Sequence, residues 1–297
     1  DSDSLGLLSR AAAADGQVLA CRTHLLDVPV TVLVPEATDL SGGQFGDSGN
    51  DAHLIRRELL PDKWEYNPLA VKWLFEVAPP RLEDGLSDLD RLSNAIQQQW
   101  GKQEIDYPLP VIRTIGEALR ADQGRVTVAL IRDAQHLHVV GIDAGDTTAS
   151  HYGVAVDIGT TTVAAHLVFL PLATIIGTRS EYNDQISCGL DVISRINYAR
   201  RPERLEELRG RVVRTINRVI EELCATHGVK AVEVCNMVVS GNTTMIHLLL
   251  GLPPESIRLE PYTPTVLNVP HMTVRNVGLA INPDAWICFS PCVGSYI

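Results

Sequence analysis

The feature that most constrains the fold is an apolar segment, residues 154–158, which ends at a glycine and three threonines and leads into a second apolar segment, residues 163–170. Two strands joined by so short a connection predict a β-hairpin. Gly159 would let an anion approach the backbone, and consecutive N–H groups in such a turn can surround phosphate oxygens. At this point an ordinary hairpin turn and a phosphate loop are both open interpretations.

The side chains beside that turn suit phosphate chemistry. Thr160 and Thr161 add hydroxyl donors, and Thr162 belongs to the same turn. Asp157, at the end of the strand, would place a carboxylate where a magnesium ion that bridges phosphates sits, usually through a water molecule. A similar pattern upstream, residues 139–148, would put the negative charge of Asp146 into the anion site and has no apolar run after it, so we interpret it as a joint between domains.

A second turn that is suited to anion binding follows a predicted strand at residues 232–239 and precedes an apolar helix at residues 245–250. Its ordinary interpretation is a helix cap, with Asn242 or Thr243 accepting from free N–H groups. Because parallel strands of one sheet carry their loops to the same edge, the two turns together predict a nucleotide site. Ser240, Gly241 and Thr243 would then bind phosphate, and Asn242 would lie near the terminal phosphate or the attacking water.

The composition limits the number of domains, the kinds of partner and the cellular location that we expect. A chain of 297 residues with 45% hydrophobic residues suggests about two domains with ample cores. The net charge of −11 argues against a nucleic-acid partner, and no apolar run is long enough to cross a membrane. Six scattered cysteines favour reduced thiols and a cytoplasmic protein. The chain lacks a starting Met and ends within an ordered-looking segment, so we expect it to be a piece of a longer protein.

The pattern of elements changes near residue 150. Before it, helices at residues 82–100 and 112–121 and a hairpin formed by residues 125–131 and 137–142 predict a small α+β module. After it, strands at residues 153–158, 163–170 and 173–180 predict a meander, and helices follow at residues 191–198 and 202–227. Asp191 and Arg195 stand four residues apart on one helix, which favours a local ion pair slightly over a role at an interface.

Five blocks, at residues 152–163, 182–186, 189–196, 238–245 and 291–296, resemble in the same order the ATP-dependent reductive activators of corrinoid proteins. That family belongs to the superfamily of acetate and sugar kinases, Hsp70 and actin (ASKHA). Two positions depart from it: Asp184 stands where the family usually has proline, and Leu190 stands where it usually has a polar residue.

The resemblance implies a multidomain α/β and α+β chain. Residues 1–35 would be the end of a plant-type ferredoxin-like domain, residues 36–60 a linker, residues 61–148 an α+β middle domain, and residues 149–297 the first part of an ASKHA ATPase domain. Cys21 would match the fourth ligand of a 2Fe–2S cluster whose other three cysteines are absent from this sequence. The second phosphate motif and the adenosine-binding segment would lie beyond residue 297, so we expect little or no hydrolysis from this chain alone.

The same resemblance implies the activity of the complete protein, an ATPase-coupled reductase. It would bind ATP and Mg²⁺ and transfer an electron from a 2Fe–2S cluster to a Co(II) corrinoid protein, which regenerates Co(I) for methyl transfer. The expected partner is that corrinoid protein, with no nucleic acid and no membrane, and a homodimer is left open. Three alternatives stay open: a sugar or acetate kinase, an activator of a radical dehydratase, and a non-enzymatic, ATP-regulated docking module that uses Trp64, Tyr66, Trp73 and Trp100.

Overall fold

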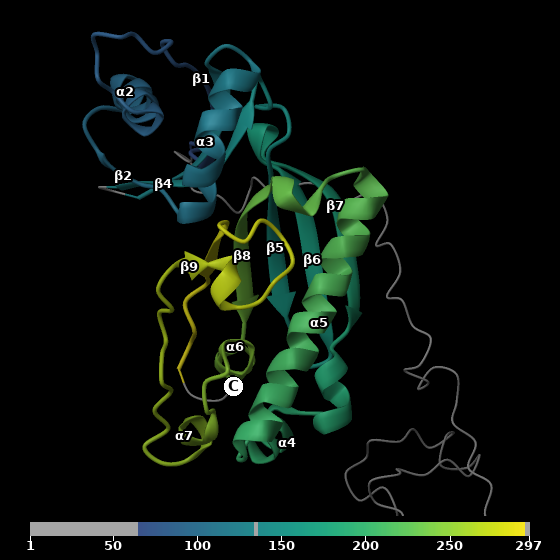
Figure 1. The fold of residues 1–297 in the computed structure, drawn as a ribbon. Coiled ribbons are helices and arrows are strands. Elements are labelled where there is room, and N and C mark those ends of the chain that lie inside the picture. The colour runs from purple at the N-terminus through teal and green to yellow at the C-terminus, as the bar shows by residue number, and fades with distance from the viewer. Residues whose placement is uncertain (1–64, 134–135, 295–297) are drawn as a thin grey trace, which may run out of the picture. The chain divides into compact units, whose positions relative to one another are not determined.

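The structure is a computed structural model, and it describes residues 65–133 and 136–294 (Figure 1). The expected ferredoxin-like end at residues 1–35, the linker at residues 36–60 and Trp64 lie outside the described residues. Two sheets organise the described part, so the expected mixture of α/β and α+β structure is confirmed. No helix within residues 65–133 and 136–294 combines the length and the apolar character of a membrane span.

The first sheet contains four strands and packs against two helices. Its strand order is β1 (Ala70–Glu76), β3 (Arg125–Arg132), β4 (His136–Ala144) and β2 (Glu104–Asp106), with the helices α2 (Asp88–Trp100) and α3 (Leu109–Ala121). Neighbouring strands are antiparallel except for β2, which runs parallel to β4. Helix α2 begins six residues later than predicted because Ser87 and Asp90 form a reciprocal capping box there.

The second sheet contains six strands in the order β7-β6-β5-β8-β10-β9. The predicted meander is present as β5 (Tyr152–Ile158), β6 (Thr162–Phe169) and β7 (Thr174–Tyr182). The strands β8 (Val234–Gly241) and β10 (Trp286–Phe289) are parallel to β5 and to each other, and β9 (Met272–Thr273) is an antiparallel edge strand. The sequence patterns missed β9, β10 and the short helix α7 (Glu255–Arg258) because each is only a few residues long.

One face of the second sheet is covered by helices and the other is more open. Helix α5 (Pro202–His227) has the predicted bounds, since Pro202 suits the first turn and Gly228 adopts the left-handed conformation after the last turn, at φ 64°. Its apolar stripe packs against β6 and β7, and α6 (Thr243–Leu250) packs beside it, while α4 (Val192–Tyr198) contacts α6 (Figure 1). The opposite face carries partly or fully exposed side chains: Ala155, Asp157, Ala164, His166, Val238 and Ser240.

His151 connects the segment between the two sheets to β1. Its Nε2 atom lies 3.0 Å from the carbonyl oxygen of Ala70, and the side chain is buried. Burial lowers the pKa of His151 to about 4, the Ala70 contact opposes that shift, and Lys72 adds to it. The imidazole is therefore neutral in the folded protein at neutral pH. Ala70, Ala129, Ile131 and Val140 of the first sheet belong to the same core as the second sheet.

The buried neutral imidazole predicts a loss of stability in acid. Because the folded pKa lies below the ordinary value of 6.5, the unfolded chain binds a proton first, so the free energy of unfolding falls as the pH drops from 6.5 to about 4. The contribution is at most about 3 kcal/mol. Denaturant unfolding across this pH range should show a shallower slope for His151→Asn than for the unsubstituted protein. Equal slopes for the two proteins would contradict the assignment.

Candidate phosphate-binding site

The two candidate loops lie side by side at one edge of the second sheet. Strand β5 pairs with β8 in parallel, with Asp157 opposite Ser240 and Ile158 opposite Gly241. Both strands therefore end at the same level, and the loops that follow them leave the sheet together. The parallel pairing that the sequence predicted is confirmed, and it produces the kind of strand-end edge at which α/β proteins bind ligands.

The carbonyl groups of the first loop all point to partners inside the protein. The carbonyl of Gly159 accepts from Asn183 Nδ2 at 2.9 Å, and that of Thr161 accepts from the Asn183 N–H at 2.8 Å. The carbonyl of Thr162 accepts from the Gly159 N–H at 2.8 Å, and that of Thr160 accepts from Arg195. Within the described residues, no acceptor contacts the N–H groups of Thr160 and Thr161. The loop thus keeps its acceptors inward and two of its donors available, which suits an anion.

Two glycines are required by close approaches between backbone segments. A Cβ atom on Gly159 would lie 2.8 Å from the Thr162 carbonyl oxygen, across the hairpin turn. A Cβ atom on Gly241 would lie 3.0 Å from the Ile158 carbonyl oxygen, where the second loop packs on the end of β5. The first turn is therefore a hairpin turn, as the ordinary interpretation held. The hairpin and the phosphate interpretation are compatible, because the hairpin is what turns the carbonyl groups inward.

Asp157 and Ser240 project from the open face of the sheet, where both are exposed, and Thr161 is exposed in the turn. Thr160 and Thr162 are partly exposed. His166 of β6 lies on the same face, since it pairs with Ala155 two residues before Asp157. Burial lowers the pKa of His166, and the Asp157 carboxylate partly opposes this shift. His166 was not predicted as a site residue from the sequence. The alternation of side chains along β6, which places His166 on the same face as Ala164, could have indicated it.

The second loop is a helix cap in its side-chain contacts. Asn242 Oδ1 accepts from the Met245 N–H at 2.9 Å, so the capping interpretation is confirmed for Asn242. Thr243 is buried, and its hydroxyl donates toward the carbonyl oxygens of Val293 and Gly294 at 3.4 and 3.3 Å. Thr243 could thus contact an anion through its N–H group at the start of α6, while its hydroxyl is engaged by the segment after β10.

Arg195 holds the first loop against neighbouring elements. It is fully buried and donates to the carbonyl of Thr160, to the Gly189 carbonyl at 2.9 Å and to Gln185 Oε1 at 3.1 Å. The expected ion pair with Asp191 is wrong: Asp191 instead caps α4 by accepting from the Ser194 N–H at 2.8 Å. Burial lowers the pKa of Arg195 to about 10, so the guanidinium stays charged at neutral pH. A buried positive charge beside the loop favours an anionic ligand.

Asp184, the first residue that departs from the family pattern, has an ion-pair partner. Asp184 begins the 3-10 helix Asp184–Cys188, and its carboxylate forms an ion pair with Arg218 Nη2 of α5 at 3.1 Å. Glu181 contacts the same guanidinium at 2.5 Å, and the two carboxylates raise the pKa of Arg218. The aspartate is thereby accommodated beside α5, whereas Leu190 is 71% exposed and nothing in the structure explains it.

The upstream copy of the motif has its carboxylate engaged. Asp143 Oδ2 lies 3.1 Å from Lys72 Nζ and accepts from the Thr147 hydroxyl at 2.8 Å. Thr127 Oγ1 bonds Gly145 and Thr147, which ties the segment back onto β3. These contacts favour Asp157 over Asp143 as the carboxylate that is available for a ligand.

Cys21, the candidate cluster ligand, lies outside the described residues. The cysteines within the described ranges are free thiols at Cys188, Cys224, Cys235, Cys288 and Cys292. Among the residues placed by the structure, no group of cysteines gathers closely enough to hold a metal cluster.

Comparison with known proteins gives consistent matches across most of the chain. A family model of the RACo linker region matches residues 61–149, and one of the RACo middle region matches residues 152–297. The corrinoid activation enzyme RamQ of Eubacterium limosum is 33% identical over 147 residues, which are 49% of this chain and 25% of RamQ. A solved structure described as a reductive activator for a corrinoid, iron-sulfur protein covers all of this chain and 47% of its own, with 33% identity and a TM-score of 0.72.

The two-sheet fold and these matches define a multidomain α/β protein of the reductive activator class. The chain belongs to the RACo family, and the resemblance found in its sequence is thereby confirmed. The first sheet falls within the family's linker region and the second within its middle region. The chain spans about half of the solved activator, and its alignment covers a quarter of RamQ.

The contacts of Arg195 predict that even a conservative substitution destabilises the protein. Arg195→Lys keeps the charge but loses the planar fork that reaches Thr160, Gly189 and Gln185 together. Denaturant unfolding should show a loss of about 1.5–3 kcal/mol, the cost of losing hydrogen bonds from a charged donor. The matched control Arg200→Lys, at an arginine side chain that is 53% exposed, should change stability by less than about 0.5 kcal/mol. An equally small change for Arg195→Lys would contradict the structural role.

Proposed function

We propose that this chain supplies one half of an ATP site in an ATP-dependent reductive activator of a corrinoid protein. The observation that carries the proposal is the pair of loops at the ends of β5 and β8, with inward carbonyl groups, available N–H groups and two exposed side chains, Asp157 and Ser240. Membership of the RACo family supports the proposed activity, because RamQ is a corrinoid activation enzyme and the solved relative is a reductive activator.

The residues of the first loop fit magnesium and phosphate. Asp157 would orient a hydrated magnesium ion, because its carboxylate is exposed at the strand end and the ion prefers oxygen ligands and retained waters. The N–H groups of Thr160 and Thr161, together with the threonine hydroxyls, would donate to phosphate oxygens. Arg195 would hold the turn in this conformation from behind, through the Thr160 carbonyl.

The second loop would complete the phosphate side of the site. Ser240 stands opposite Asp157 and would donate its hydroxyl, while Gly241 lets the loop pack on the end of β5. The Thr243 N–H, at the start of α6, would add the positive end of a helix. Asn242 keeps its oxygen on the Met245 N–H, so its amide NH₂ group would face the terminal phosphate or the attacking water.

In the complete protein, nucleotide binding would drive a one-electron reduction. Co(II) in a corrinoid protein would gain one electron and become Co(I), with a 2Fe–2S cluster as the donor and Cys21 as one of its ligands. ATP can favour this uphill step only by binding one conformation of the activator more tightly than another. The same loop would serve a kinase of the superfamily, but that reaction would transfer phosphate to an acceptor and leave Co(II) unchanged.

The test uses the complete protein with a Co(II) corrinoid protein, a reductant and ATP, and follows the absorption of Co(I). Asp157→Ala should lower the ATP-dependent rate by about 100-fold, because the magnesium ion loses the carboxylate that orients it. Asp146→Asn, an exposed carboxylate of the upstream motif, should keep the full rate.

Two outcomes would contradict the proposal. Absence of ATP-dependent Co(I) with every corrinoid partner would refute the activator function, and a phosphorylated acceptor in the same mixture would favour the kinase. Full activity of Asp157→Ala would refute the assignment of the site while leaving the activator function intact.

A further inference from the structure

A second group of chemically active side chains lies on the first sheet. Strands β2 and β4 are parallel, with Glu104 opposite His136 and Asp106 opposite His138. Because alternate residues of a strand point to the same face, the four side chains form a two-by-two array of carboxylates and imidazoles. None of the four belongs to the proposed nucleotide site.

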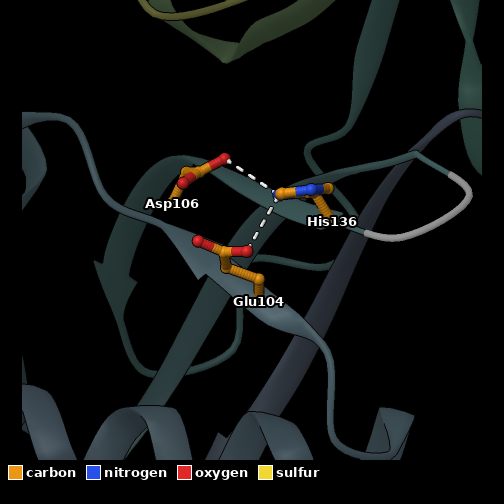
Figure 2. A group of neighbouring side chains, drawn as sticks. All are labelled: Glu104, Asp106 and His136. Atoms are coloured by element: carbon orange, nitrogen blue, oxygen red, sulfur yellow. Dashed lines mark ion pairs between the residues drawn. The ribbon is translucent and has the colours of Figure 1, made fainter.

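Three of these side chains converge on one point. His136 Nδ1 lies 3.8 Å from Glu104 Oε2 and 3.7 Å from Asp106 Oδ2. One ligand atom from each of the three residues lies within 4.8 Å of the others. Figure 2 shows both carboxylates directed at the imidazole from β2. Metal–ligand bonds of about 2.0–2.2 Å place neighbouring ligand atoms roughly 3.0–3.5 Å apart, so small side-chain rotations would close the set around an ion.

The fourth residue holds one ligand in place. His138 Nδ1 lies 2.9 Å from Asp106 Oδ2, and the His138 ring packs against Trp286 with their centroids 4.3 Å apart. The rings of His136 and His138 are stacked at an interplanar angle of 12°. The contact with His138 orients the Asp106 carboxylate before an ion binds. In metal sites, residues around the ligands orient them in the same way.

The array is also open to an ion from solution. The side chains of Glu104, Asp106 and His136 are 73%, 51% and 37% exposed, so water can complete the coordination. A cross-strand contact between carboxylates and imidazole, without an ion, is the competing explanation of the same geometry. Only a bound ion would give a saturable metal spectrum that depends on these side chains.

We propose that Glu104, Asp106 and His136 bind a divalent transition-metal ion of the Zn²⁺ type, with His138 as the positioning residue for Asp106. Imidazole combined with carboxylates is the ligand set that suits such ions, and three protein ligands leave a position for water. The site is independent of the proposed nucleotide function, since its residues belong to another sheet.

The test is a titration of the untagged chain with Co²⁺ at pH 7.5, followed through the visible absorption of bound Co²⁺ and reversed with Zn²⁺. We expect one ion per chain. Glu104→Gln and His136→Ala should each weaken binding by at least about 10-fold. His227→Ala, at an exposed histidine at the end of α5, should bind as the unsubstituted chain does. Because Glu104 is exposed and His136 is partly exposed, both variants should keep the unfolding midpoint, which circular dichroism would verify.

Three results would overturn the proposal. The first is an unsubstituted chain that binds no Co²⁺. The second is unchanged affinity in both variants, which would place the ion elsewhere. The third is a thiolate-to-cobalt absorption that survives both substitutions, because it would assign the ion to cysteine ligands.

Discussion

The parallel pairing of β5 with β8 is the constraint on which the candidate site depends. It sets Asp157 opposite Ser240, so that these two side chains project from the same face and both strands release their loops at the same edge. An antiparallel pairing would have sent the second loop to the far end of the sheet. The pairing is stabilised by apolar residues on the covered face, including Val156 and Val239, which are buried in the core with α5. The core of the sheet therefore fixes the geometry of a surface site.

The conformation of the first loop depends on groups that are distant in sequence. Asn183 bonds two of its carbonyl groups, and Arg195 bonds a third. A fully buried guanidinium is costly to desolvate, as its lowered pKa shows, and four polar contacts offset that cost. The loop is thus held from its inner side, which leaves its N–H groups and hydroxyls free to face a ligand without reorganisation.

The sequence predicted the elements that carry long or strongly marked patterns. Helix α5 has the predicted bounds because Pro202 and Gly228 mark its ends, and the meander follows from its apolar runs. The contacts of Arg195 could not be predicted, because an i, i+4 spacing to Asp191 suggests a surface ion pair and only tertiary packing buries the side chain. The array of Glu104 and His136 was hidden for a related reason: β2 has three residues, and nothing local indicates that it pairs with β4.

The two copies of the Asp-x-Gly motif show what decides whether such a pattern can bind a ligand. Both follow a strand, yet Asp143 is paired with a nearly buried Lys72, whereas Asp157 is exposed beside Ser240. A carboxylate that already neutralises a lysine would have to give up that pair before it could orient a cation, and the abandoned lysine would remain inside the protein. Asp157 carries no such cost. The motif can therefore bind a ligand only where its carboxylate has no ion-pair partner within the protein. Whether such a partner is present depends on which strands lie next to the loop.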